Sequence, residues 1–110
     1  MKTLTISYRD TANGPVLDVA GDLDYAHAPE LRRQVDQVPL TPGQRLVLDL
    51  SGLEFCDSTG ITALLAARQH ALAAGAGIVL AGVPANLLRV LTLVGLDQVF
   101  TLLPDSSPAS

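Results

Sequence analysis

The chain begins with a strict alternation of apolar and polar positions. Leu4, Ile6 and Tyr8 alternate with threonine and serine, which is the pattern of a half-buried strand. Residues 10–14 contain turn-forming side chains, and their Asn-Gly pair favours a β-hairpin. Residues 15–20 are strand-like again, and the Gly-Asp-Leu-Asp that follows is expected to close this strand. The pattern therefore predicts an antiparallel hairpin.

A helical period follows. Leu31, Val35 and Val38 recur at a spacing that places them on one helix face. Pro29 suits the first helical position and disfavours a helical Ala28. We therefore predict an amphipathic helix from Pro29 to about Val38. His27, just before it, is expected to be a surface histidine.

The central stretch combines a strand, a polar hinge and a helix. Residues 45–50 (RLVLDL) are almost continuously apolar, which suits a strand covered on both faces. Asp57-Ser58-Thr59-Gly60 interrupts this character before a second helical pattern begins. Asp, Ser and Thr cap helix starts well, so plain capping is one interpretation of these residues. We expect Ser58 at the cap and Thr59 at the first helical position.

The second helix has two predicted faces. One face should pack on the sheet, with a partly buried arginine beside it; it carries Ile61, Leu64, Leu65, Arg68 and Leu72. The other should face outward and carries Thr62, Ala63, Ala66, Gln69, His70 and Ala73. The alanines are either simply good helix formers or a flat, neutral face for a partner protein. The adjacent hydroxyl of Ser58 favours the second interpretation.

The C-terminal third predicts one more strand–helix unit. Residues 78–81 are short and wholly apolar, as in an interior parallel strand. The helix after Pro84 should pack through Leu87, Leu88, Leu91 and Val94, and residues 99–102 suggest an edge strand. Residues 104–110 are expected to be a flexible tail.

Composition narrows the class of protein. The chain has 110 residues, 48% of them apolar and 16% charged, which predicts a single globular domain. Its net charge of −4 argues against direct binding to nucleic acid or to an anionic membrane. It contains neither a signal peptide nor an apolar run of the length that a membrane helix needs, so we expect a cytoplasmic protein without membrane insertion.

The usual signatures of catalysis and cofactor binding are missing from the sequence. His27 and His70 have no metal-ligand spacing, and no phosphate-binding glycine loop or nucleophile elbow occurs. Cys56 is expected to be a small apolar filler, although a thiol near a helix start is sometimes reactive. We therefore predict a protein that is not an enzyme and uses no cofactor or metal.

The segment 47–61, VLDLSGLEFCDSTGI, resembles the signature of STAS domains. The GDLD step at 21–24 and the stretch 94–100 resemble other parts of the same family. The resemblance extends over residues 4–103 and covers nearly the whole chain. It implies an α/β fold in which a mixed sheet carries an antiparallel N-terminal hairpin and right-handed βα crossovers.

Within that family, the chain resembles bacterial anti-sigma factor antagonists. The resemblance implies binding to an anti-sigma factor that is often a serine kinase, release by phosphorylation of Ser58, and resetting by a serine phosphatase. The expected partner surface excludes the Arg32–Arg33 face and consists of Asp22, Asp24, Asp57, Ser58, Thr59, Gly60, Thr62, Ala63, Ala66, Gln69 and His70. The alternatives are a scaffold subunit of a transporter or stress-signalling complex without a phospho-switch, and a small-molecule or nucleotide module. The oligomeric state stays open.

Overall fold

The structure, a computed structural model, describes residues 2–104. Its strands and helices follow one another in the predicted order, with boundaries that differ by a few residues. They are β1 (Thr5–Thr11), β2 (Gly14–Leu23), α1 (Ala28–Gln37), β3 (Arg45–Cys56), α2 (Ser58–Ala73), β4 (Gly77–Ala81), α3 (Ala85–Leu93), a short 3-10 helix η1 (Leu96–Gln98) and β5 (Thr101–Leu103). The expected tail lies outside the described residues, except for Pro104.

The strands form one sheet in the order β1-β2-β3-β4-β5. β1 pairs antiparallel with β2, and all the other pairs are parallel, so the predicted hairpin and the predicted mixed sheet are confirmed. The GDLD step was expected to close β2 after residue 20. Instead, β2 continues to Leu23 alongside β3, with two shifts of register. The ends of β2 and β3 therefore lie side by side, immediately before the start of α2.

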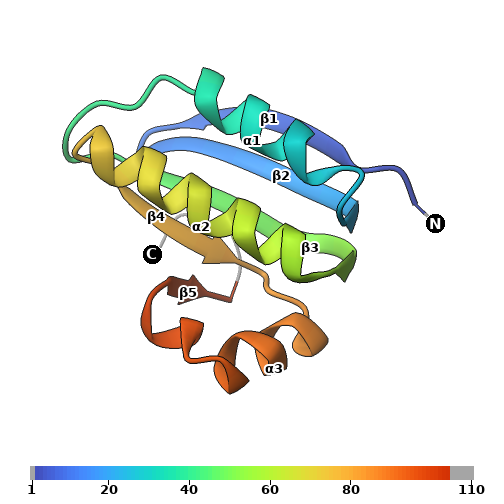
Figure 1. The fold of residues 1–110 in the computed structure, drawn as a ribbon. Coiled ribbons are helices and arrows are strands. Elements are labelled where there is room, and N and C mark those ends of the chain that lie inside the picture. Colours follow the sequence, from blue (N-terminus) through green and yellow to red (C-terminus); the bar gives the residue numbers. More distant parts are fainter. Residues whose placement is uncertain (1, 105–110) are drawn as a thin grey trace.

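α1 and α2 pack side by side on one face of the sheet (Figure 1). The predicted stripe of α1 is confirmed, because Leu31, Val35 and Val38 are all buried. Beneath α2, the leucines of β3 at 46, 48 and 50 are fully buried, whereas Val47 and Asp49 between them are only half-buried. The expectation that β3 is covered on both faces is therefore wrong, since its buried and less buried positions alternate.

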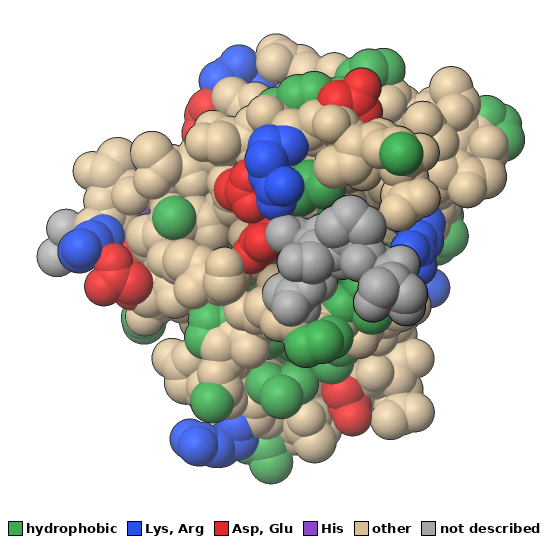
Figure 2. All heavy atoms as spheres, turned by 180° about the vertical axis from the view of Figure 1, so that it is seen from behind, with side chains coloured by type: hydrophobic (Ala, Val, Ile, Leu, Met, Phe, Trp, Pro, Cys, Tyr) green, Lys and Arg blue, Asp and Glu red, His purple; other side chains and the backbone are tan. Residues whose placement is uncertain are grey.

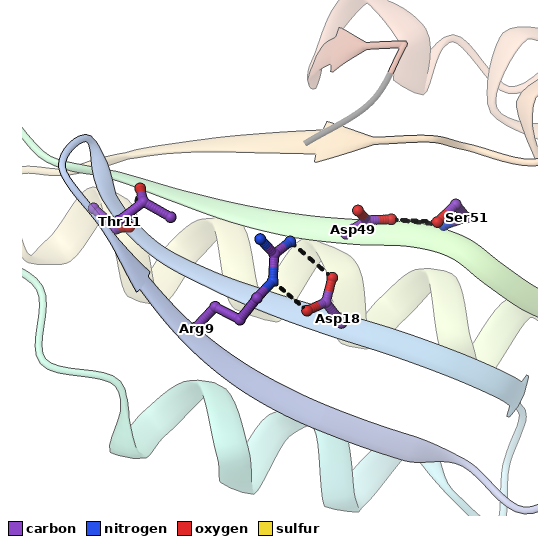
Figure 3. Close-up of polar contacts among 6 residues, drawn as sticks. Arg9, Thr11, Asp18, Asp49 and Ser51 are labelled. Carbon is purple, nitrogen blue, oxygen red and sulfur yellow. Dashed lines mark hydrogen bonds and ion pairs between the residues drawn. The ribbon is translucent and has the colours of Figure 1, made fainter. Parts of the chain in front are cut away.

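The opposite face of the sheet carries polar side chains. Arg9 on β1 donates two hydrogen bonds to the carboxylate of Asp18 on β2, over 2.6 and 3.0 Å (Figure 3). Asp49 is the register partner of Asp18 on β3 and accepts a 2.6 Å bond from the hydroxyl of Ser51. These contacts explain why aspartates interrupt otherwise apolar strands.

The buried face of α2 differs from the predicted one. The residues that pack inward are Gly60, Ala63, Leu64, Ala67 and Ala71. Leu72, expected in the core, is 48% exposed, and Ala63, expected outside, is only 1% exposed. Side-chain size misled the prediction, because the small side chains let α2 approach the sheet and α1 closely. The predictions for Leu72 and Ala63 are therefore wrong.

α3 lies beyond the α1–α2 layer, near β5 (Figure 1). Its predicted packing residues Leu87 and Leu91 are buried, but Leu88 and Val94 are exposed, so that part of the prediction is wrong. Figure 2 shows apolar side chains gathered on this part of the surface when the molecule is viewed from behind. Among the described residues, the helices are all too short or too polar to cross a membrane.

Candidate functional site

The site begins at Asp57, between the end of β3 and the first turn of α2. The backbone of Asp57 is extended, and its Oδ1 accepts a 2.9 Å hydrogen bond from the amide of Gly60. Asp57 is therefore the N-cap of α2, and Ser58 is its first helical residue. The expectation that Ser58 is the cap and Thr59 the first helical residue is wrong by one position, because the aspartate caps the helix before the serine does.

The second oxygen of Asp57 reaches another element. Oδ2 accepts a 3.1 Å hydrogen bond from the amide of Tyr25, in the loop between β2 and α1. The amide of Asp57 in turn donates to the carbonyl of Leu23, over 3.3 Å. Asp57 is thus bonded on both sides, and it fixes the start of α2 against the end of β2.

Ser58 lies exposed on this fixed helix start. Within residues 2–104 its hydroxyl makes no hydrogen bond, whereas its carbonyl accepts a 3.0 Å bond from the hydroxyl of Thr62. Thr59 is half-buried. Gly60 uses its amide for the cap, so the first turn leaves the amides of Ser58 and Thr59 without an intrahelical partner. This is a favourable position for an anion, since the helix dipole is positive there.

Gly60 has a structural part in this arrangement. It is buried, and a Cβ placed on it would overlap the carbonyl oxygen of Leu23 and crowd the sulfur of Cys56. The close approach of α2 to the end of β2 therefore requires glycine. Gly60 was predicted as a partner contact, but its burial means that it supports the surface from beneath.

The two aspartates of the GDLD step are also buried. Asp22 and Asp24 are 7% and 6% exposed, which leaves little of either for a partner to touch. The carboxylate of Asp22 accepts a 3.0 Å bond from the amide of Lys2. Oδ1 of Asp24 accepts from the amide of His27, 3.1 Å away, and lies 2.7 Å from the Nδ1 of its ring. His27 is thus a fixed N-cap residue of α1 and not a free surface histidine; α1 starts at Ala28, one residue earlier than predicted.

Two of these groups have shifted pKa values. Burial opposes the charge on Asp24, but the hydrogen bonds from His27 outweigh it, so the pKa of this carboxyl lies below its usual value. Burial, together with the charge of Asp57, raises the pKa of the Cys56 thiol to about 12. A thiol held protonated at neutral pH is a poor nucleophile, which favours the interpretation of Cys56 as an apolar filler. Within residues 2–104, no three His, Cys, Asp or Glu side chains are grouped to hold a metal ion.

The outward face of α2 meets α1 along a seam. Thr62 and Gln69 are exposed, and Ala66 and His70 are half-buried. Across the seam, His70 Nδ1 lies 3.7 Å from a carboxylate oxygen of Asp36. Four of the predicted partner residues of α2, Thr59, Thr62, Ala66 and Gln69, therefore share a surface with residues of α1.

Two residues of this surface were missed by the sequence analysis. Tyr25 and Arg32 line the same hollow as Thr59 and Thr62, so Arg32, which was left out of the expected partner surface, lies beside part of it. Which residues of α1 lie beside which residues of α2 depends on how the two helices pack, and no local sequence pattern encodes this. Tyr25 did leave a signal, because an aromatic residue in a polar loop is unusual in a chain with 4% aromatic residues.

Comparison with known proteins agrees with this geometry. The family model described as "Mlab, STAS domain" matches residues 6–104. The chain belongs to the STAS domain family. Among its relatives, the anti-sigma-F factor antagonist RsfB of Mycobacterium tuberculosis is 30% identical over 102 residues, which cover 91% of this chain and 81% of RsfB. The anti-sigma-B factor antagonist of Listeria monocytogenes is 26% identical over 100 residues, covering 91% and 87% of the two chains.

Solved structures share this STAS fold. An anti-sigma factor antagonist from Mycobacterium paratuberculosis superimposes with a TM-score of 0.72 at 31% identity, covering 94% of this chain and 88% of that one. A sulfate transporter family protein from Wolinella succinogenes also reaches 0.72, at 20% identity, covering 83% and 76%. At that identity the second likeness shows the fold alone. The resemblance identified from residues 47–61 is confirmed.

Proposed function

We propose that this STAS domain is a cytoplasmic anti-sigma factor antagonist that is switched by phosphorylation of Ser58. In the unphosphorylated state it binds an anti-sigma factor and so releases a sigma factor for transcription. The observation that carries the proposal is the placement of Ser58 on the first turn of α2, where the residue is exposed and its hydroxyl bonds to none of the residues 2–104. The names of its 30% and 31% identical relatives support the same role.

Ser58 is suited to be the substrate of a kinase. A kinase supplies the base and the magnesium ions itself, so its substrate needs only an accessible hydroxyl on a segment with a defined backbone. Asp57 fixes the backbone next to Ser58, because its carboxylate accepts hydrogen bonds from the amides of Gly60 and Tyr25. Thr59 is the less accessible hydroxyl, because it is half-buried. We therefore assign the modification to Ser58.

The phosphate would change the surface and leave the fold intact. It adds a charge of about −1.5 to −2 at a helix N-terminus, where the dipole and the free amides of the first turn favour an anion. A partner that covered Ser58 would then have to bury this dianion next to the carboxylate of Asp57, which is unfavourable. Phosphorylation should therefore release the anti-sigma factor, and a serine phosphatase would restore binding.

The test uses purified wild-type chain, Ser58→Ala and Thr59→Ala. Each is incubated with Mg-ATP and, one at a time, with the serine-kinase anti-sigma factors encoded in the same genome, followed by peptide mass mapping. Wild type and Thr59→Ala should gain one phosphate on Ser58, and Ser58→Ala should gain none. Titration calorimetry should show binding that is lost on phosphorylation. Phosphate on Thr59 alone would refute the assignment to Ser58, and a chain that binds none of these proteins would refute the function.

The surface of α3 favours a second candidate function, a permanent scaffold subunit of a transporter or stress-signalling complex. Val90 and Leu93 on this helix, and Val94 directly after it, are exposed apolar residues, with Leu93 78% exposed. Exposed apolar patches of this kind mark protein interfaces. In a scaffold, Leu93→Glu should disrupt the assembly, whereas Ser58→Ala and Ser58→Glu should both leave it unchanged. In the phospho-switch, Ser58→Glu should abolish binding and Ser58→Ala should not.

A further inference from the structure

Two hollows lie along the seam between α1 and α2, and Arg32 lines both of them. The first has a volume of about 360 Å³ and lies where the two helices start, between Tyr25 and Pro29 on one side and Thr59 and Thr62 on the other. The second, of about 310 Å³, lies further along the seam and includes Asp36, Ala66 and Gln69. Arg32 therefore stands at the middle of the seam.

Arg32 is an unpaired cation. Its side chain is exposed and makes no hydrogen bond or ion pair with any residue that the structure describes. Its neighbour Arg33 differs, because its Nη2 lies 2.6 Å from a carboxylate oxygen of Glu30. Among the arginines without a partner in the described part of the chain, Arg32 is the one that lines these two hollows. Its natural counterpart is a carboxylate, which arginine binds through two parallel hydrogen bonds.

The other side of the first hollow is aromatic. The side chain of Tyr25 is 80% exposed, although its backbone is held by the bond from its amide to Asp57. A large ring on a fixed backbone gives contact area at a small entropic cost. Tyrosine and arginine are also the residue types that most often dominate binding energy in protein interfaces. The hollow therefore offers an apolar anchor point and a cationic one side by side.

We infer that this hollow is the docking site for a segment of the anti-sigma factor that carries a carboxylate next to an apolar side chain. The carboxylate pairs with Arg32, and the apolar side chain packs on Tyr25 and Pro29. The inference rests on the proposed function and specifies which chemistry of the partner is recognised. The hollow is continuous with the Ser58 surface, because Thr59, the next residue, forms part of its wall.

This docking mode gives the phospho-switch a physical basis. A phosphate on Ser58 is attached one residue from Thr59 and one helical turn from Thr62, which both line the hollow that the partner's carboxylate enters. The two anions repel each other, and the phosphate competes with the carboxylate for Arg32. Release then depends in part on Arg32, in addition to the steric bulk of the phosphate.

The first experiment compares Arg32→Gln with the matched control Arg33→Gln, on the same helix and of the same chemistry. Calorimetric titration of the full chain against the serine-kinase anti-sigma factors of its genome should show an increase in Kd of about tenfold for Arg32→Gln and for Tyr25→Ala. Arg33→Gln should change Kd less than about threefold, since it removes only an exposed ion pair. Circular dichroism confirms that each variant is folded. Wild-type affinity in Arg32→Gln and Tyr25→Ala would overturn the docking site and leave the proposed function standing, whereas no binding by the wild-type chain would overturn both.

The second experiment is a double-mutant cycle with Ser58→Glu. If the added charge acts through Arg32, Ser58→Glu should weaken binding by a smaller factor in the Arg32→Gln background than in the wild type. Equal factors in both backgrounds would overturn the competition at Arg32.

Sedimentation of the isolated chain tests whether a second copy of the chain fills the hollow. A dimer that Arg32→Gln converts to a monomer would show that a second copy fills the hollow, and would overturn the assignment to the anti-sigma factor.

Discussion

The carboxylate of Asp57 joins the start of α2 to the backbone of Tyr25, a residue 32 positions earlier in the chain. One oxygen caps the helix that presents Ser58, and the other holds the loop that presents Tyr25. A single side chain therefore positions both the proposed phosphorylation site and the aromatic wall of the proposed docking hollow. The aspartate of the DSTG motif is in this sense a structural residue that serves a functional surface.

Replacing Asp57 should therefore destabilise the protein. Asp57→Ala removes a helix cap and leaves the amide of Tyr25 without its partner, so we expect the free energy of unfolding to fall by about 1–3 kcal/mol. Ser58→Ala is the control, because its hydroxyl makes no hydrogen bond within the described residues, and it should change stability by less than about 0.5 kcal/mol. Urea denaturation measures both. Equal stabilities for the two variants would show that the Asp57 bonds contribute little.

A negative charge at Ser58 should leave the fold unchanged. The residue is exposed at the first position of α2, where the helix dipole favours an anion. Thermal melts of Ser58→Glu and wild type should agree within a few degrees, which corresponds to less than about 1 kcal/mol. Loss of helical circular dichroism in Ser58→Glu would instead mean that the serine is needed for folding, and the phospho-switch would lose its basis.

Local patterns were sufficient to predict the order of the main strands and helices and the helix start at Asp57 and Ser58. The stripe of Leu31 and Val35 and the Asn-Gly turn act over a few residues, so the sequence encodes them directly. Asp57 and Ser58 were found in the same way, since capping is a local interaction. Only the cap and the first helical position were each assigned one residue too late.

The orientation of α2 could not be predicted in this way. Its inward face carries the small residues Gly60, Ala63 and Ala67 beside Leu64, whereas Leu72 is exposed. Small side chains pack inward where two backbones come close. At Gly60 the neighbouring backbone is that of Leu23, in a strand far away in the sequence. The place of Tyr25 and Arg32 beside Thr59 likewise depends on how α1 packs against α2. Such relations belong to the tertiary structure and not to a sequence window.

The corrected face of α2 changes the test of the partner surface. Thr62 is exposed and Ala63 is 1% exposed, although they are neighbours in the chain. Ala63→Arg should therefore unfold or strongly destabilise the protein, by more than about 3 kcal/mol, because it buries a charge in a packed core. Thr62→Arg should stay folded and weaken binding to the anti-sigma factor by more than about 2 kcal/mol. Urea denaturation and calorimetry distinguish the two effects. A stable, folded Ala63→Arg would show that α2 is turned as the sequence first suggested.

The bond between Asp24 and His27 should make part of the stability dependent on acid. The pKa of Asp24 is lowered in the folded state, so its carboxylate favours folding at any pH above the unfolded-state value of about 3.9. That contribution is lost as the pH falls through the lower pKa of the folded state. Asp24→Asn cannot provide it, so wild type should be the more stable protein at neutral pH, and the difference should shrink below about pH 4.

Urea denaturation of both proteins between pH 3 and pH 7 measures this difference. Asp10→Asn is a suitable control, because Asp10 is an exposed aspartate of β1 whose side chain makes no hydrogen bond among the described residues. It should match wild type at neutral pH, where Asp24→Asn should not. If the gap between wild type and Asp24→Asn widened on acidification, the buried carboxylate would oppose folding. Its bonds to His27 would then not compensate for its burial at the start of α1.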